Sequence, residues 1–115
     1  MMIVLSNLDY FHHNIIYGIG FDVHKLIPHK YLTLGGIKID YPFKLEGHSD
    51  GDALIHSIID SILGACGLGD IGHYFSSEDT SFKDIDSQIM LSEIKDMVNK
   101  KIYLRVLIII KEKYK

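Results

Sequence analysis

Residues 46–63 read EGHSDGDALIHSIIDSIL, a polar stretch with two glycines that passes directly into a helical pattern. From residue 54 onward, apolar residues recur three and four positions apart, as they do on the buried face of a helix. Ser49 or Asp50 is the expected N-cap, and the glycines at 64, 67 and 69 are expected to end the helix. The stretch therefore predicts a loop of reactive side chains held at the start of a core helix.

Strands are expected before this helix. Residues 15–21 are apolar with glycines at 18 and 20, which predicts a strand whose backbone lies close to another element. Residues 31–34 and 37–39 are short β-type runs on either side of Gly35-Gly36, and this pattern predicts a hairpin.

After the helix, residues 70–85 are expected to be irregular, and a second helix is expected over residues 87–99 with Asp86 as its cap. The inward residues of that helix are expected to be Ile89, Ile94, Met97 and Val98. Residues 103–110 predict a strand buried on both faces. Strands mixed with two helices predict an α+β fold, with a mixed sheet packed against helices and incomplete at its C-terminal end.

Composition narrows the function classes. A chain of 115 residues with 47% hydrophobic residues fits one domain, and a net charge of -3 gives no basic surface for nucleic acid. Its single cysteine excludes an internal disulfide, which argues against a secreted scaffold. No apolar run approaches the length of a membrane span, and residues 1–16 do not resemble a signal peptide. We expect neither secretion nor a membrane partner.

Asp22 and His24 are two residues apart, so an extended segment would place both side chains on one face. With His56 from the helix they offer the ligands of a catalytic zinc site that leaves one position for a substrate oxygen. The spacing alone also fits a surface Asp–His pair and a core histidine. On the helix, Asp52 and Asp60 share a face with His56, and either carboxylate could accept a proton from one ring nitrogen and leave the other for a metal.

Further motifs follow one another along the chain. They are Gly18-Ile19-Gly20-Phe21-Asp22-Val23-His24, Leu34-Gly35-Gly36-Ile37, Glu46-Gly47-His48-Ser49-Asp50-Gly51-Asp52-Ala53-Leu54-Ile55-His56, Leu68-Gly69-Asp70-Ile71-Gly72 with Phe75, and Asp86-Ser87. In order and spacing, this set resembles the 2-C-methyl-D-erythritol 2,4-cyclodiphosphate synthase family. The resemblance covers about residues 17 to 110.

By this resemblance the zinc ligands are Asp22, His24 and His56, and the catalytic residue is His48, which would stabilise charge on phosphate. The implied substrate-binding residues are Asp22, Val23, His24, His48, Ser49, Asp70, Ile71, Gly72, Phe75 and Asp79. The implied lyase reaction of the non-mevalonate isoprenoid pathway converts 4-diphosphocytidyl-2-C-methyl-D-erythritol 2-phosphate to 2-C-methyl-D-erythritol 2,4-cyclodiphosphate and CMP. The resemblance also implies a homotrimer with shared active sites and a second divalent ion, Mg²⁺ or Mn²⁺.

The chain departs from the family pattern at three places. Residues 1–16 are expected to be an N-terminal extension without family counterpart, and residues 17–115 a truncated synthase domain that lacks the cytidine pocket. After Phe75 the usual Pro-Asp-Thr-Asp is replaced by Ser76-Ser77-Glu78-Asp79, so the acid expected at position 77 is missing.

Two alternatives to an active synthase stay open. One is a non-catalytic remnant that still binds zinc, and the other is an unrelated zinc hydrolase, which the absence of a separate general base disfavours. The expected compartment is an apicoplast-like plastid if the source is a plastid-bearing eukaryote, and otherwise the bacterial cytoplasm.

Overall fold

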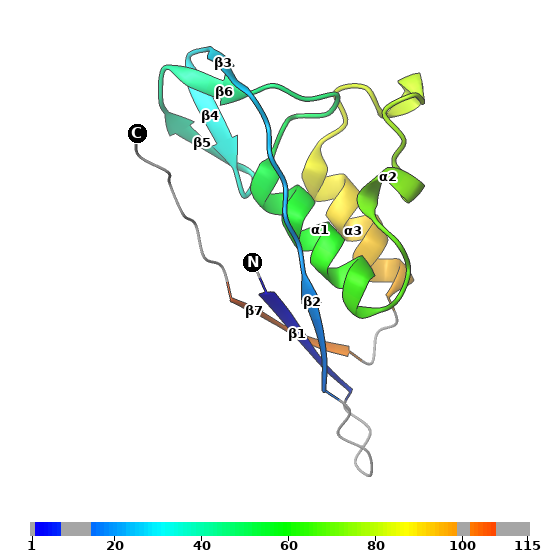
Figure 1. Cartoon of the computed structure of the whole chain (residues 1–115). Helices are drawn as coiled ribbons and strands as arrows, with labels where there is room; N and C mark the ends of the chain where they lie inside the picture. The colour runs from blue at the N-terminus through cyan, green and yellow to red at the C-terminus, as the bar shows by residue number, and fades with distance from the viewer. Residues whose placement is uncertain (1, 8–14, 99–101, 108–115) are drawn as a thin grey trace.

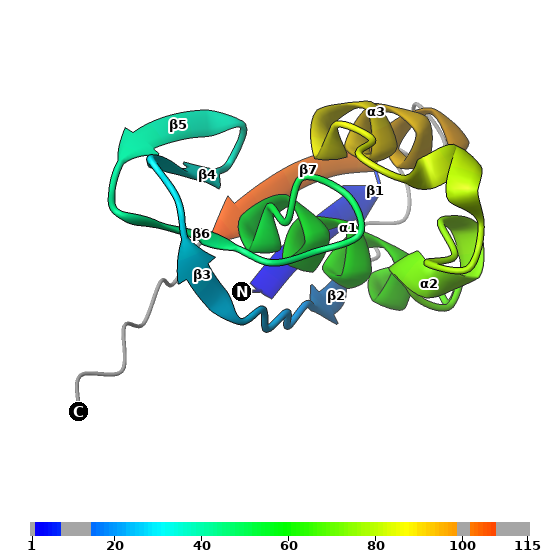
Figure 2. The same cartoon turned by 90° about the horizontal axis from the view of Figure 1, so that it is seen from above.

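The computed structural model describes residues 2–7, 15–98 and 102–107 of the chain (Figure 1). Helix α1 (Ala53–Ala65) lies at the centre of the molecule. It packs against α3 (Ser87–Met97) on one side and against β2 (Ile15–Ile19) on the other. Seen from above, α1 separates the β4–β5 hairpin from the side of the molecule formed by α2 and α3 (Figure 2). The α+β class is confirmed.

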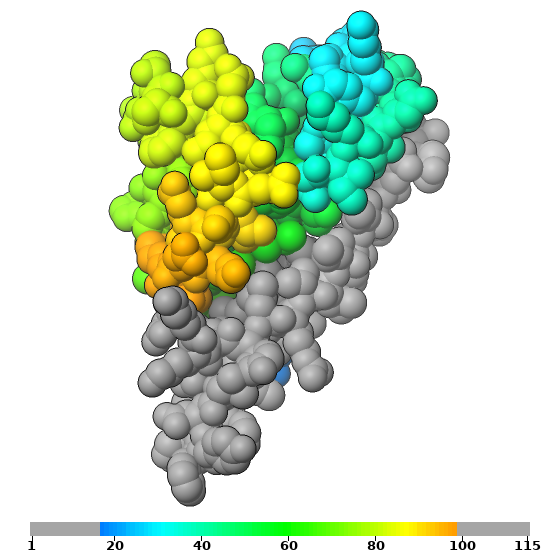
Figure 3. All heavy atoms as spheres, turned by 180° about the vertical axis from the view of Figure 1, so that it is seen from behind, coloured from blue at the N-terminus to red at the C-terminus, as the bar shows by residue number. Residues whose placement is uncertain are grey.

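The core lies mainly between α1 and α3. Its buried apolar residues are Ile55, Ile59, Ile62, Leu63, Phe75, Met90 and Ile94. Ile59 and Leu63 have no exposed surface, which confirms the helical pattern predicted from residue 54 onward. In the space-filling view from behind, α3 and the hairpin flank a narrow band of α1 (Figure 3).

The inward face of α3 was predicted only in part. Ile94 is buried, but Ile89 and Met97 are 53% and 44% exposed. Met90 takes an inward position instead, and Ser87 is also fully buried. Asp86 is the N-cap, as predicted, and positions 87, 90 and 94 then share one face because they are three and four residues apart.

The largest sheet joins strands from both ends of the chain. Strand β1 (Met2–Asn7) lies between β2 and β7 (Ile102–Leu107) and is antiparallel to both. Every strand pairing among the described residues is antiparallel, where a mixed sheet was expected. Strand β7 overlaps the strand predicted at residues 103–110, although residues 108–110 and the side chains of β7 lie outside the described part.

Two small sheets lie near the start of α1. Strands β4 (Tyr31–Leu34) and β5 (Ile37–Asp40) form the predicted hairpin, with Leu34 opposite Ile37. Gly35 and Gly36 have φ angles of 64° and 77°, the left-handed values that a two-residue type I′ turn requires at both positions. Strands β3 (Leu26–Pro28) and β6 (Phe43–Leu45) form the second pair.

The N-cap of α1 is Asp52, and the prediction of Ser49 or Asp50 was wrong. The Asp52 carboxylate accepts a hydrogen bond from the Ile55 amide at 3.1 Å. Gly51 has a φ of 72°, so the chain turns between residue 50 and the helix, and Asp50 points to other partners.

Residues 70–85 are more regular than predicted. They contain α2 (Ile71–Tyr74), capped by Asp70, and the 3₁₀ turn η1 (Thr80–Phe82), capped by Asp79. Each cap accepts a backbone N–H from within the segment, and the Ile71 amide donates to Asp60 of α1 at 2.8 Å, which holds the start of α2 against α1. No helix in the described ranges combines the length and hydropathy that crossing a bilayer demands.

Candidate metal centre

The chain from residue 17 to residue 24 alternates between exposed and covered side chains. Its even-numbered residues face α1, beginning with Gly18 and Gly20. A Cβ atom at Gly18 would lie 1.8 Å from the Ser61 carbonyl oxygen, and one at Gly20 would lie 1.7 Å from that of Ser57. Only glycine permits this approach, which confirms the predicted close contact.

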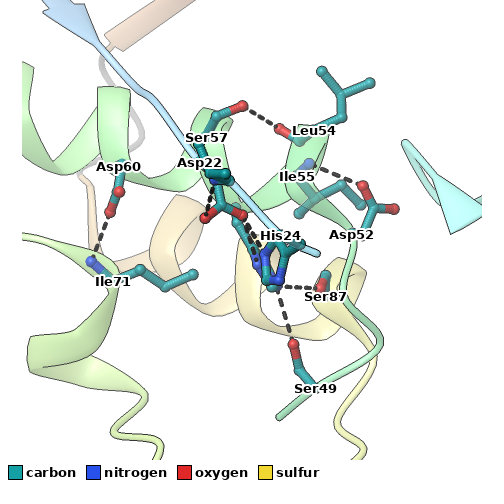
Figure 4. A network of polar contacts seen from close by, with 12 residues as sticks. Asp22, His24, Ser49, Asp52, Leu54, Ile55, Ser57, Asp60, Ile71 and Ser87 are labelled. Carbon is teal, nitrogen blue, oxygen red and sulfur yellow. Dashed lines mark hydrogen bonds and ion pairs between the residues drawn. The ribbon is translucent and has the colours of Figure 1, made fainter. Parts of the chain in front are cut away.

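The same face continues to Asp22 and His24, so the close approach of the glycines brings both side chains over α1. Asp22 and His24 point toward each other (Figure 4), with Asp22 Oδ2 2.6 Å from His24 Nε2. The same Asp22 oxygen lies 3.2 Å from His56 Nδ1. One ligand-type atom from each residue lies within 4.8 Å of the others. The predicted shared face of Asp22 and His24 is confirmed, and so is the meeting with His56.

The hydrogen bonding of His24 suits a cation. Its Nδ1 lies 2.6 Å from the carbonyl oxygen of Glu46, which only accepts hydrogen bonds, so Nδ1 carries the proton. In the neutral His24 ring, Nε2 then carries a lone pair, and this lone pair and the Asp22 carboxylate face the same position. Two electron-pair donors 2.6 Å apart need a positive charge between them, either a proton or a metal ion.

Asp22 is ionised at neutral pH. Burial by itself raises the pKa of Asp22, but without a metal the hydrogen bonds and positive charge of the protonated His56 and His24 rings outweigh it, and the pKa lies below its ordinary value. A carboxylate with two imidazoles is a ligand set that zinc accepts, because its sites use histidine nitrogen and carboxylate oxygen. The three residues therefore fit a divalent metal of this kind.

A cavity of about 310 Å³ opens over these three residues. Its walls include the predicted residues His48, Ser49, Ile71, Gly72 and Phe75, together with Ser77, Phe82, Ile85 and Met90. The structure thus brings three distant segments of the sequence, around residues 22, 48 and 72, to one hollow. A second cavity of similar volume is lined by His29, Tyr31 and Lys44 and by residues of the loop before α1, and none of the three ligands lines it.

Three predicted contact residues do not line this cavity. Val23 is 72% exposed, although its amide donates to Asp22 Oδ1 at 3.0 Å. The carboxylates of Asp70 and Asp79 accept backbone N–H groups from His73 and Ser81. Hydrogen bonds from Ser81 lower the pKa of Asp79. The roles expected for these three residues in substrate binding stay predictions.

His48 and Ser49 lie beside the three ligands without joining them. His48 Nε2 is 3.3 Å from the Asp79 carbonyl oxygen, so this ring links the loop to η1. Ser49 Oγ is 3.0 Å from His56 Nε2, on the side of the ring opposite the metal position. The described residues hold one group of three side chains suited to a metal, and His48 is not part of it.

The expected carboxylate partner of His56 was wrong. Asp52 turns away to the hairpin, where it accepts from Gly35 and Gly36, and Asp60 accepts from the Ile71 amide at 2.8 Å (Figure 4). The ring nitrogen of His56 that faces away from Asp22 contacts Ser87 Oγ at 2.8 Å instead. Sequence reasoning gave Ser87 no role, and its only signal was the Asp86-Ser87 motif before the second helix.

The fold and the site define an α+β protein with an Asp-His-His centre suited to a divalent metal, set at the edge of a cavity. Residues 15–112 match the model of the YgbB family. The chain belongs to this family, that of the 2-C-methyl-D-erythritol 2,4-cyclodiphosphate synthases.

Curated relatives agree with this placement. The chain is 54% identical over 102 residues to the bifunctional enzyme IspD/IspF of Pelagibacter ubique, covering 88% of this chain and 28% of that protein. It is 49% identical over 86 residues to the 2-C-methyl-D-erythritol 2,4-cyclodiphosphate synthase of Clostridium botulinum, covering 75% and 56%. The chain therefore spans about half the length of the single-function relative.

Solved structures give the same result. A 2C-methyl-D-erythritol-2,4-cyclodiphosphate synthase matches with a TM-score of 0.65 and 40% identity over 70% of this chain and 54% of that one. IspF of Plasmodium falciparum in complex with CDP matches with a TM-score of 0.57 and 37% identity, covering 86% and 52%.

Proposed function

We propose that this chain carries the zinc-binding part of a 2-C-methyl-D-erythritol 2,4-cyclodiphosphate synthase active site, with Asp22, His24 and His56 as the metal ligands. The observation that carries the proposal is the meeting of three ligand atoms within 4.8 Å at the edge of a cavity. Zinc held there would act as a Lewis acid on a diphosphate oxygen.

The proposed substrate is 4-diphosphocytidyl-2-C-methyl-D-erythritol 2-phosphate, which the whole enzyme converts to the 2,4-cyclodiphosphate and CMP. The names of the curated relatives support this reaction. Two solved relatives bound to CDP support a cytidine nucleotide as part of the ligand. A second divalent ion, Mg²⁺ or Mn²⁺, would neutralise phosphate charge in the complete site.

The work proposed for the protein is positioning and charge stabilisation, which dominate phosphoryl transfer. His48 and Ser49 lie on the cavity wall next to the ligands, where they contact phosphate oxygens, and His48 stabilises the charge that develops during the reaction. Ile71, Gly72 and Phe75 form another part of the wall and hold the substrate against it. Asp70, at the start of α2, receives sugar hydroxyls.

We also propose the homotrimer that the family resemblance implies, and an exposed apolar row in residues 17–23, on the side that faces away from α1, supports contact between copies. Tyr17, Ile19, Phe21 and Val23 alternate with the residues that face α1, and they are 63%, 76%, 79% and 72% exposed. Contiguous apolar surface of this kind marks interaction sites, and its burial against neighbouring copies is favourable.

The curated relatives named above are bacterial, which favours the bacterial cytoplasm over a plastid.

The metal content of the purified chain tests the ligand assignment. The wild-type chain should bind about one equivalent of zinc, and His56→Ala should bind essentially none. His73→Ala is the matched control, because His73 is exposed on α2 and lies outside the group of three. Equal zinc in the wild-type and His56→Ala chains would overturn the assignment.

The second candidate is a non-catalytic remnant that keeps zinc. The observation that favours it is that the aligned part covers 56% of the single-function relative. The assay is CMP release from substrate with zinc and magnesium present. We expect the 115-residue chain tested alone to be slow, because it spans about half of the single-function relative, and contacts made by the rest of that enzyme would contribute to turnover as well as affinity. Release at the rate of a full-length relative would remove the remnant from consideration.

A further inference from the structure

Ser87 is a fully buried residue that connects the proposed metal centre to a second carboxylate. It is the first residue of α3 and has no exposed surface. Its hydroxyl contacts Asp50 Oδ1 on one side and lies 2.8 Å from His56 Nε2 on the other. The Asp50 Oδ1 atom itself is 4.0 Å from His56 Nε2, so the serine stands between the two.

The direction of these hydrogen bonds follows from what each group can donate. The Asp50 carboxylate only accepts, so the Ser87 hydroxyl donates its single proton to Asp50. The Ser87 oxygen is then left to accept, and His56 must supply the proton from Nε2. With Nε2 protonated, the neutral ring has its lone pair on Nδ1, the atom 3.2 Å from Asp22 Oδ2.

Asp50 is held so that it cannot turn away from Ser87. Its Oδ2 accepts the Ser87 backbone N–H at 2.9 Å, and its Oδ1 accepts the Asp52 amide at 3.0 Å. One carboxylate thereby ties the start of α3 to the start of α1. Ser49 also reaches His56 Nε2, at 3.0 Å, but no described contact fixes its hydroxyl from behind.

We propose that Asp50 and Ser87 are positioning residues that fix the protonation and orientation of the His56 ring, so that Nδ1 faces the metal position. This inference rests on the proposed zinc site, but it concerns residues outside the ligand set. Neutral histidine ligands commonly donate their other N–H to a carboxylate or a similar acceptor, and loss of such a partner costs about 10- to 100-fold in metal affinity. Here the carboxylate acts through a serine hydroxyl.

The test compares zinc affinity, measured by chelator competition, with ¹⁵N NMR of the His56 ring in the full chain. Ser87→Ala should weaken zinc binding about 10- to 100-fold, and the Nε2 proton of His56 should lose its protection from solvent exchange. Ser87→Thr keeps the hydroxyl and should restore both properties. Ser61→Ala is the matched control, because Ser61 is also fully buried and, among the described residues, its hydroxyl donates to the Ile58 carbonyl and not to the site.

The two measurements distinguish failure of the positioning role from failure of the zinc site. Unchanged zinc affinity together with an unchanged His56 Nε2 proton in Ser87→Ala would overturn the positioning role. If Ser87→Ala does not fold, the same measurements are made on Asp50→Asn. The asparagine side chain keeps one of the two acceptor oxygens that Asp50 offers to Ser87 and loses the other. If the wild-type chain binds no zinc, the proposed metal site fails, and the NMR signal of the metal-free chain still decides whether Ser87 holds the ring.

Discussion

The Asp52 carboxylate accepts a hydrogen bond from the Gly36 amide at 2.7 Å, which joins the start of α1 to the β4–β5 turn. Its other oxygen accepts the amides of Gly35 at 2.9 Å and Ile55 at 3.1 Å. Asp52 has no exposed surface, so these three donors replace the water that a carboxylate would otherwise bind. The residue that caps the central helix therefore also holds the hairpin in place.

Asp52→Ala should lower the free energy of unfolding by roughly 2–4 kcal/mol, because it removes a helix cap and leaves buried amides unpaired. Urea unfolding followed by circular dichroism measures this change. Asp96→Asn is the control, since Asp96 is exposed on α3 and should shift stability by less than about 0.5 kcal/mol. An Asp52→Ala midpoint equal to that of the control would contradict the dual role.

The same substitution should have opposite effects at two glycines. Gly20→Ala places a Cβ atom 1.7 Å from the Ser57 carbonyl oxygen, so the segment that follows β2 must move off α1 and carry Asp22 with it. We expect at least about a tenfold loss of zinc affinity together with lower stability. Gly64→Ala meets nothing within 4 Å in α1 and should raise stability by about 0.5–1 kcal/mol.

Thermal unfolding and zinc titration of both glycine variants check this contrast. Zinc affinity in Gly64→Ala should equal that of the wild type, because Gly64 is exposed and lies outside the site. A Gly20→Ala chain with unchanged zinc affinity would show that the close contact between Gly20 and α1 is not what places the ligands.

Asp60 should make stability depend on pH. Burial raises the pKa of Asp60 and the nearby Asp70 and Asp22 carboxylates add to the effect, although the Ile71 amide opposes it. A raised folded-state pKa means that the charged form costs stability at neutral pH, and this cost is relieved as the pH falls toward about 4, the ordinary value of aspartate. Asp60→Asn removes the cost and keeps an acceptor for Ile71.

Asp60→Asn should therefore be at least as stable as the wild-type chain at pH 7, and the difference should shrink as the pH is lowered. Urea unfolding at several pH values, with a chelator present, measures it. A less stable variant at pH 7 would mean that the hydrogen bond from Ile71 to the charged oxygen is worth more than the burial costs.

His48→Ala, made in a full-length relative that carries the same motif, should keep its zinc and lose turnover by about 100- to 1000-fold. In this chain His48 lines the cavity but stands outside the ligand group, so its ring can act on phosphate charge without binding the metal. Zinc analysis and CMP release on the same preparation separate the two effects. Loss of zinc along with activity would make His48 a ligand.

Local sequence patterns predicted the helix and the hairpin, because these elements depend on residues close to one another in the sequence. The central helix followed from apolar spacing, and the hairpin followed from Gly35-Gly36, because few other residues adopt the left-handed turn. The cap of α1 could not be read, since Ser49, Asp50 and Asp52 all have suitable side chains. Their assignment depends on partners far away, the hairpin amides for Asp52 and the start of α3 for Asp50.

In the candidate site, too, some features were predictable from local sequence and others depend on the packing of distant segments. The shared face of Asp22 and His24 is a property of extended backbone and was predictable from their spacing. Their meeting with His56 was expected from the family resemblance, since spacing alone also fitted a surface pair. The contact between Ser87 and His56 joins residues 31 positions apart through the packing of α1 on α3, and no local pattern contains it.

The position of β1 has a consequence for how the chain is made. Met2 pairs with Ile19 on one side and with Leu107 on the other, so β1 is synthesised about 100 residues before one of its two partner strands. At about 5–20 residues per second, the second edge of this apolar strand stays open for roughly 5–20 seconds of translation. A nascent chain with such an edge is a natural client for chaperones that shield unpaired strands.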